Sequence, residues 1–301
     1  MKNLTWLASY PKSGNTWTRM FLFAYRSSGQ SISSLEKVNS VSASESRYSH
    51  FIEISGRPRT DLSELEIDRM RESVQHRLAA SGRSDRVYKT HNARVRHNGF
   101  PLIRREFTKS AIYVCRNPLD IVDSLADHVN FSHDEVIDLM NSPVHRMGGQ
   151  DSPLVTQHLD TWSTHASSWN SATEFPLLLL RYEDLKANPV ERFRDVVEFL
   201  GWELNEDRLE AAVAATEFEN LRTMEEEQGF AEKSLRSRSG RFFRSGVAGA
   251  WPQRLTKQQA ARIIEHHGTV MQQLGYEIPD LDAVYAADGR ADIEAGLSPR
   301  A

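Results

Sequence analysis

The chain has 301 residues and a single cysteine, Cys115. One thiol excludes a disulfide framework and any zinc or iron–sulfur site built from several cysteines. Cys115 ends the apolar run 111–115, so we expect a buried and unreactive thiol.

Long apolar segments are absent as well. No stretch approaches the roughly 18 to 20 apolar residues that span a bilayer. The apolar stretch Leu4–Ser9 is too short for a signal peptide and runs directly into Tyr10-Pro11-Lys12. We therefore expect a cytoplasmic protein without a membrane partner.

An excess of either charge is also missing, with 37 Lys and Arg against 41 Asp and Glu and a formal net charge of -4. This balance argues against wholesale coating of nucleic acid and leaves room for a local basic site. A hydrophobic content of 39% is typical of a globular protein. A chain of this length can bury about three quarters of its extended surface, so it needs no metal or disulfide for stability.

Apolar runs alternate with helix-start signals along the chain. Buried strands are predicted at 4–9, 86–89, 111–115 and 177–181, the last of them buried on both faces because it lacks alternation. Helices are predicted to start at Asn15 as N-cap, Ser63 with Glu66, Asn117-Pro118, Ser132 with Glu135, Ser152-Pro153, Asn188-Pro189 and Thr256 with Gln259. The serine-rich segment 27–60 is expected to be a mobile excursion.

This alternation of strands and helices predicts an α/β fold, with a central parallel β-sheet flanked by helices on both faces. We expect a single domain over residues 1–280, followed by a polar surface tail over 281–301.

The turn after the first predicted strand has the features of an anion site. A helix N-terminus behind a tight turn presents free backbone N–H groups and the positive end of the helix dipole. Lys12 adds a positive charge, and Ser13 and Thr16 add hydroxyl donors. An ordinary strand-to-helix turn is the alternative. The Walker pattern is absent, because Lys12 precedes Gly14 instead of following a glycine.

Five segments together resemble the cytosolic-type sulfotransferases, which use 3′-phosphoadenosine-5′-phosphosulfate (PAPS) as sulfuryl donor. In chain order they are Tyr10–Trp17, Tyr88–His91, Tyr113–Asp120 with Ser124, Tyr182–Leu185 with Asn188-Pro189, and Arg244–Gly246 with Gly249 and Trp251. In the family they form the 5′-phosphosulfate loop, the catalytic-histidine segment, the 3′-phosphate segment, the adenine segment and a C-terminal nucleotide loop. The resemblance implies the sulfotransferase variant of the P-loop-containing nucleotide hydrolase fold.

The resemblance also implies residue roles. Lys12, Lys89 and His91 would be catalytic, with His91 as general base for in-line sulfuryl transfer to a hydroxyl or amine. The donor would be bound by Lys12, Ser13, Gly14, Asn15, Thr16, Trp17, Arg116, Ser124, Tyr182, Thr216, Phe218, Phe243, Arg244, Ser245 and Gly246. From spacing alone, Trp17 fits a core aromatic equally well, and Arg116 with Ser124 fits a structural pair.

The chain departs from the family pattern at two positions: Ser245 replaces a lysine and Ala250 replaces an aspartate. The basic, aromatic segment 225–250 is expected to be a flap that closes over the nucleotide. No histidine spacing typical of a metal site is present, so we assign no metal.

Two other function classes fit parts of the sequence. A P-loop kinase for a small molecule or nucleotide would use the leucine run before Arg181-Tyr182-Glu183-Asp184 as its acidic strand, but the Walker lysine is missing. An RNA-binding module would use the cations of segment 233–244.

The expected acceptor is a small hydroxylated molecule. Tyr48, Phe51 and Phe131 would suit an apolar or ring-bearing one, while a carbohydrate or lipid stays open. The family's C-terminal dimer motif is not recognisable around 255–265, which leaves the oligomeric state open.

Overall fold

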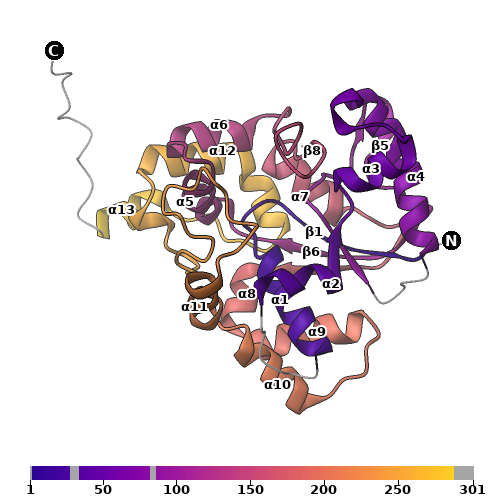
Figure 1. Ribbon diagram of the computed structural model, residues 1–301. Helices are drawn as coiled ribbons and strands as arrows, with labels where there is room; N and C mark the ends of the chain where they lie inside the picture. Colours follow the sequence, from indigo (N-terminus) through magenta and orange to yellow (C-terminus); the bar gives the residue numbers. More distant parts are fainter. Residues whose placement is uncertain (1, 28–33, 82–85, 288–301) are drawn as a thin grey trace.

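The computed structural model describes residues 2–27, 34–81 and 86–287. At its centre is a five-stranded sheet in the order β2-β3-β1-β6-β9, in which all neighbouring strands run parallel (Figure 1). These strands are β1 Leu4–Ser9, β2 Ser42–Ser44, β3 Val87–Thr90, β6 Thr108–Cys115 and β9 Leu177–Arg181. The predicted α/β fold with a central parallel sheet is confirmed.

The helices cover both faces of this sheet. They are α1 Asn15–Arg26, α2 Val38–Val41, α3 Tyr48–Ser55, α4 Glu64–Ala80, α5 Pro118–Val129, α6 His133–Asn141, α7 Trp162–Asn170, α8 Tyr182–Ala187, α9 Pro189–Phe199, α10 Glu206–Ala215, α11 Phe218–Gln228, α12 Lys257–Gln273 and α13 Leu281–Ala287. Short two-stranded pieces, β4 Arg96–His97 with β5 Phe100–Pro101 and β7 Arg146–Met147 with β8 Gln157–His158, lie outside the main sheet.

Two apolar cores lie on opposite faces of the sheet. Successive side chains of a strand point to opposite faces, so Trp6 and Leu7 enter different cores. Trp6 belongs to the core that α5, α6, α7 and α12 complete, and Leu7 to the core of α1, α9 and α10. Cys115 is buried as predicted, and burial raises the pKa of its thiol to about 12.

Most predicted helix starts are confirmed. Ser63, Ser132 and Thr256 each form a capping box, and the Asn117 side chain accepts a hydrogen bond from the backbone N–H of Leu119. Two predictions are wrong. Gly14 is the N-cap of α1 in place of Asn15, and no helix starts at Ser152, because α7 begins only at Trp162.

The serine-rich segment 27–60, which we expected to be a mobile excursion, contains regular secondary structure. Its described part forms α2, α3 and the edge strand β2, which pairs with β3. Ser42 and Ser44 are buried, and the Ser42 hydroxyl accepts a hydrogen bond from Arg19. Ser42 here supplies a hydrogen-bond acceptor for a buried arginine, a role that the serine-rich composition of the segment does not reveal. Residues 28–33 lie outside the described residues.

Two expectations about the C-terminal half also need correction. β9 is the second edge strand of the sheet, opposite β2, and is mostly half-buried, not buried on both faces. The first part of the predicted polar tail is helix α13, because Tyr285 is buried and donates a hydrogen bond to the carbonyl of Leu255. Residues 288–301 of that tail lie outside the described residues. Within the described part of the chain, every helix is too short or too polar to cross a membrane.

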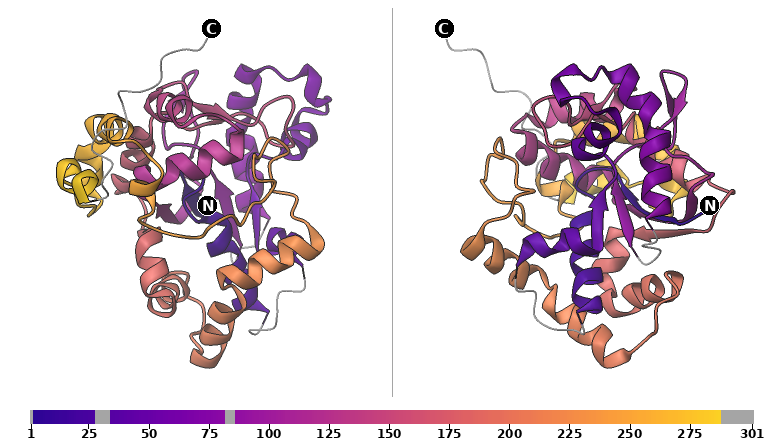
Figure 2. Two further views of the ribbon diagram at one scale, coloured as in Figure 1. Left: turned by 90° about the vertical axis from the view of Figure 1, so that its left-hand side faces the viewer. Right: turned by 45° about the vertical axis from the view of Figure 1, so that its right-hand side comes forward.

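Parallel strands bring their carboxyl ends to one edge of the sheet. Ala8 in β1 pairs with Thr90 in β3 on one side and with Tyr113 in β6 on the other. The loop after β1, the residues after β3 and the start of α5 therefore meet at this edge. The irregular segment 229–250, a long orange loop between α11 and α12 in Figure 2, contributes further residues there.

Candidate active site

A cavity of about 650 Å³ opens at the carboxyl edge of the sheet. Of the residues predicted to bind the donor or act in catalysis, it is lined by Lys12, Gly14, Asn15, Thr16, Trp17, Lys89, His91, Arg116, Ser124, Tyr182, Phe218, Phe243, Arg244, Ser245 and Gly246. The fold thus brings residues from all five predicted segments to one cavity. Ser13 and Thr216 do not line it.

The loop after β1 is shaped by two left-handed residues, Lys12 with φ 66° and Gly14 with φ 105°. A side chain at Gly14 would have its Cβ 2.8 Å from the Tyr182 ring, so both the backbone conformation and the close approach require glycine. Ser13 is buried, and its hydroxyl has no hydrogen-bond partner among the described residues.

The Asn15 side chain hydrogen-bonds to the strand before this loop and does not cap the helix after it. Its buried side-chain amide donates to the carbonyl of Leu7 at 3.1 Å and to the hydroxyl of Ser9 at 3.2 Å. Both acceptors belong to β1, so Asn15 ties the first turn of α1 to the strand before it.

Lys12 is half-buried and lies beside an aromatic ring and other cations. Its Nζ lies 4.4 Å from the centroid of the Phe242 ring. Burial, with a smaller contribution from Arg116, lowers the pKa of Lys12 to about 8. The amine is therefore sensitive to any negative charge that enters the cavity.

Trp17 combines the two alternatives that the sequence left open. Its ring contacts Phe193 of the apolar core edge-on at 5.4 Å between centroids, and it contacts Tyr182 at 5.9 Å. Trp17 also lines the cavity, and its indole N–H has no hydrogen-bond partner among the described residues. One face of the cavity wall is thus aromatic.

Arg116 contacts three segments of the chain around the cavity: the loop after β1, the flap and the start of α8. Its guanidinium donates to the carbonyl of Lys12 at 3.2 Å and to that of Val247 at 2.9 Å. The same group lies 4.5 Å from the centroid of the Tyr182 ring, and its Nε is buried without a partner in the described chain. Ser124 lies further along α5 on the same cavity.

The flap segment reaches this end through its last residues. Arg244 is paired with Asp123 of α5, and Asp120 accepts the backbone N–H groups of Gly249 at 2.6 Å and Trp251 at 3.0 Å. Gly246 has φ 59°, and a Cβ there would collide with the Phe218 ring. Asp120 and Asp123 of α5 therefore anchor the end of the flap.

Thr216 is a corrected expectation. Its buried hydroxyl donates to the carbonyls of Ala212 and Val213, at 2.9 Å and 3.1 Å, at the end of α10. This side chain is used to close its own helix. The aromatics expected to suit an acceptor also lie elsewhere: Tyr48 and Phe51 belong to a separate apolar cluster, and Phe131 does not line the cavity.

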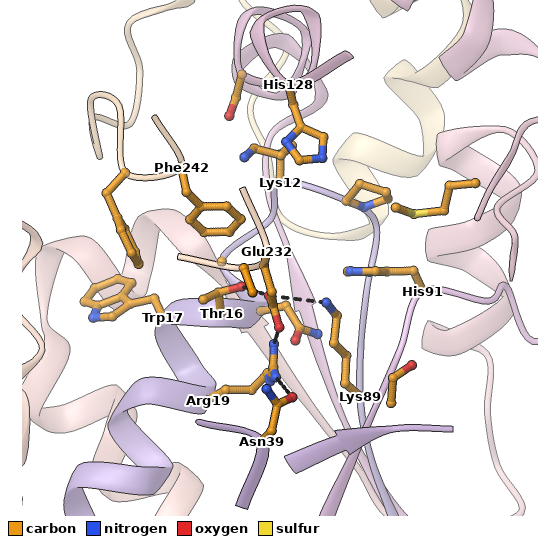
Figure 3. Close-up of a pocket in the computed structure, with 18 of the residues that line it drawn as sticks. Lys12, Thr16, Trp17, Arg19, Asn39, Lys89, His91, His128, Glu232 and Phe242 are labelled. Carbon is orange, nitrogen blue, oxygen red and sulfur yellow. Dashed lines mark hydrogen bonds and ion pairs between the residues drawn. The ribbon is translucent and has the colours of Figure 1, made fainter. Parts of the chain in front are cut away.

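His91 points into the cavity from the end of β3 (Figure 3). Its Nδ1 lies 2.7 Å from the carbonyl oxygen of Ser9, which can only accept a hydrogen bond. Nδ1 therefore carries the proton, and Nε2 is the basic nitrogen. Burial, reinforced by the charge of Lys89, holds the pKa of His91 well below its usual range. The imidazole is neutral at pH 7 and able to accept a proton.

Among the lining residues that were not predicted from the sequence are Arg19, His128, Glu232 and Phe242. Arg19 follows Thr16 by one helical turn, so the helix period could have indicated that it shares the face of Thr16. Glu232 is the single acidic residue between 228 and 254 in an otherwise basic segment. Burial lowers the pKa of His128 to about 4.

A cluster of metal-ligand type lies elsewhere, around β4 and β8. Ligand atoms of Asp68, His97 and His158 fall within 4.8 Å of one another. Asp68 already accepts hydrogen bonds from Arg71 at 3.1 Å and from Asn98 at 3.0 Å, and lies 2.6 Å from His97 Nδ1. Because a guanidinium already neutralises this carboxylate, we assign no metal to it.

Comparison with known proteins decides the family. The model of the sulfotransferase domain matches residues 2–275. The chain belongs to the sulfotransferase family. The resemblance stated from the sequence motifs and the enzyme class are both confirmed.

Individual sulfotransferases are distant in sequence and similar over most of the chain. Sulfotransferase 1B1 of Canis lupus familiaris is 26% identical over 264 residues, covering 84% of this chain and 78% of that protein. Cytosolic sulfotransferase 13 of Arabidopsis thaliana is 24% identical over 266 residues, covering 85% and 73%. A solved structure of retinol dehydratase, in complex with androsterone and the inactive cofactor PAP, matches with a TM-score of 0.59 at 16% identity, over 93% of this chain and 84% of that one.

Proposed function

We propose that this sulfotransferase moves the sulfuryl group of PAPS to a hydroxyl group of a small molecule, with His91 as general base. The observation that carries the proposal is the meeting of His91, Lys12 and Lys89 in one cavity with the Arg116 end of the nucleotide site. Arg116 lines this cavity, and its buried Nε has no hydrogen-bond partner among the described residues, which supports a ligand with anionic oxygens at this place.

The proposed proton transfer follows from the orientation of His91. The acceptor oxygen forms a bond to sulfur while the bond between sulfur and the phosphate oxygen breaks. The hydroxyl proton passes to Nε2, because Nδ1 is already protonated toward Ser9. The imidazolium that forms is stabilised through this hydrogen bond to the Ser9 carbonyl.

Lys12 and Lys89 supply charge for the departing phosphate. Negative charge grows on the leaving oxygen during transfer, and fixed cations in a cavity shielded from water stabilise it strongly. Arg116, Ser124 and Arg244 are proposed to bind the 3′-phosphate, with Trp17, Tyr182 and Phe218 around the adenine. Ser245 stands where the family has lysine, so Arg116 and Arg244 are the two cations that we propose for the 3′-phosphate.

We propose a small hydroxylated acceptor that enters beside His91. The retinol dehydratase structure holds androsterone together with PAP, which supports a small-molecule acceptor here. The lining that remains for it is mixed in character, with the apolar side chains of Met147 and Leu154 and the polar side chains of Asn39 and Arg47. The Arabidopsis relative is named a cytosolic sulfotransferase, which supports a cytoplasmic location.

The two alternative functions receive less support from the described residues. An RNA-binding surface needs free cations, yet Arg241 and Arg244 of the flap are paired with Glu226 and Asp123. A kinase would be expected to bind ATP with Mg²⁺, whereas the proposed site favours a 3′-phosphorylated nucleotide through Arg116 and Ser124.

Calorimetry with 3′-phosphoadenosine-5′-phosphate (PAP), AMP and Mg²⁺-ATP tests the proposal. We expect PAP to bind much more tightly than either of the others, because only PAP carries the 3′-phosphate. Equal affinities for PAP and AMP would defeat it. A screen of phenols, alcohols, amines and sugars with PAPS, read by mass spectrometry, then identifies the acceptor class.

A further inference from the structure

A carboxylate of the protein itself lies inside the cavity. Glu232, from the flap, accepts hydrogen bonds from Arg19 at 2.6 Å and from Thr16 at 3.1 Å, and Lys89 Nζ lies 3.5 Å from it (Figure 3). Its three partners come from α1 and β3, whereas Glu232 comes from the irregular segment after α11. Three positively polarised groups therefore converge on one anion.

This cluster has the composition of an anion site. The Arg19 side chain is 1% exposed and that of Lys89 is 12% exposed. Although burial opposes ionisation, Lys89 and Arg19 hold the pKa of Glu232 well below its usual range, so the carboxylate is charged. A hydroxyl, an amine and a guanidinium around one carboxylate match the groups that bind phosphate and sulfate oxygens in proteins.

Two of the three partners also belong to the proposed donor site. Thr16 lies at the start of α1 in the phosphosulfate loop, and Lys89 lies two residues before His91. A bound donor and the Glu232 carboxylate cannot both use them, because two anions at one place repel each other strongly where water is excluded.

We propose that Arg19, with Thr16 and Lys89, binds the phosphosulfate group of the donor, and that Glu232 is a tethered anion that competes for this site. This inference rests on the proposed function. Arg19 is thereby a further donor-binding residue, and Glu232 must leave the site when the donor enters.

The other contacts of Arg19 support the proposal that an anionic ligand replaces the Glu232 carboxylate beside it. Its other hydrogen bonds go to neutral groups, the Ser42 hydroxyl at 2.5 Å and the Asn39 side-chain oxygen at 3.2 Å. Within the described residues, Glu232 is the one carboxylate that pairs with Arg19. A buried guanidinium left without a counter-charge is strongly unfavourable, so an incoming anion replaces the carboxylate that it displaces.

The test compares two ligands on matched variants. PAP carries both phosphates, whereas adenosine 3′-monophosphate lacks the 5′ group that would meet Arg19. Removing the internal competitor in Glu232→Gln should tighten PAP binding by about tenfold, because the competent state of the site becomes fully populated. The affinity for adenosine 3′-monophosphate should stay unchanged. Glu227→Gln, an exposed glutamate of α11, is the matched control and should bind both ligands like the parent protein.

Arg19 is tested in the Glu232→Gln background, where it no longer has to hold the carboxylate. There, Arg19→Gln should weaken PAP binding by about tenfold and leave adenosine 3′-monophosphate unaffected, while Arg19→Lys should keep part of the affinity because the charge remains. If the Gln variant folds poorly, Glu232→Asp serves instead: it is one methylene shorter, cannot reach all three partners, and should also tighten PAP binding.

The outcomes separate the two proposals. Unchanged or weaker PAP binding in folded Glu232→Gln and Glu232→Asp overturns the inference, because Glu232 would then be a structural partner of Arg19 and Lys89. An equal loss of both ligands in the Arg19 variant overturns the assignment of Arg19. Failure of the parent protein to prefer PAP over AMP instead contradicts the proposed function itself.

Discussion

His91 Nδ1 and the carbonyl oxygen of Ser9 are 2.7 Å apart, and this contact leaves Nε2 as the basic atom facing the cavity. Ser9 is the last residue of β1, immediately before the loop of Lys12. The strand that positions the Lys12 loop therefore also fixes the tautomer of the proposed base.

The His91→Ala variant should lose at least ~10²-fold in turnover, the usual contribution of a positioned general base. PAP affinity should stay nearly constant, because the imidazole accepts its proton from the acceptor. Steady-state kinetics with PAPS and calorimetry with PAP give the two values. Near-normal turnover of the variant on its true acceptor would remove His91 from the mechanism.

The pH profile should show the depressed pKa of His91. A base acts only when deprotonated, and burial places its pKa well below 6.5. For the free enzyme, kcat/KM should therefore be level around pH 7 and fall only on the acid side of 6.5. A rising limb centred near or above neutral pH in the parent protein contradicts this assignment.

The alkaline limb of the pH profile should come from Lys12. Its pKa is about 8, so the positive charge present below that pH is lost above it. For the free enzyme, kcat/KM for PAPS should fall above about pH 8. Lys12→Arg keeps its charge in this range and should move or abolish the limb. A limb that persists in Lys12→Arg assigns it to another group.

Lys12→Ala separates a binding role from a catalytic one. If the amine neutralises charge that develops on the leaving phosphate, the variant should lose more in turnover than in PAP affinity. Turnover at saturating PAPS and the Kd of PAP are the two readings. Weaker binding with unchanged turnover would make Lys12 a binding residue only.

Arg116→Ala should weaken PAP binding by about 2 to 3 kcal/mol, as expected for a charge-assisted phosphate contact. AMP binding should change much less, because AMP lacks the 3′-phosphate. Arg105→Ala removes an exposed arginine away from the cavity and serves as control. Equal losses for both nucleotides would indicate that Arg116 acts by holding the Lys12 loop.

Hydrogen exchange tests the closing of the flap. Arg244 and Gly246 line the cavity, so PAP should increase protection of the backbone in residues 241–250. Equal protection with and without PAP would show that Asp120 and Asp123 already hold this part of the flap in place.

Local sequence signals determined where most helices of this protein start and where four strands of its sheet lie. Capping boxes at Ser63, Ser132 and Thr256 act within three residues, and apolar runs marked four strands of the parallel sheet, so both could be predicted. The order of strands and helices then brings the expected site segments to one sheet edge, since parallel strands end together.

Tertiary structure decided what depends on distant partners. Asn15 has the residue type of a helix cap, yet buried acceptors in β1 take its amide. The short serine-rich strand β2 forms only because β3 is beside it. Glu232 and Arg19 lie 213 positions apart, and no local pattern predicts that a basic loop delivers its one carboxylate to a buried arginine. Burial makes such contacts strong, and burial is a property of the whole fold.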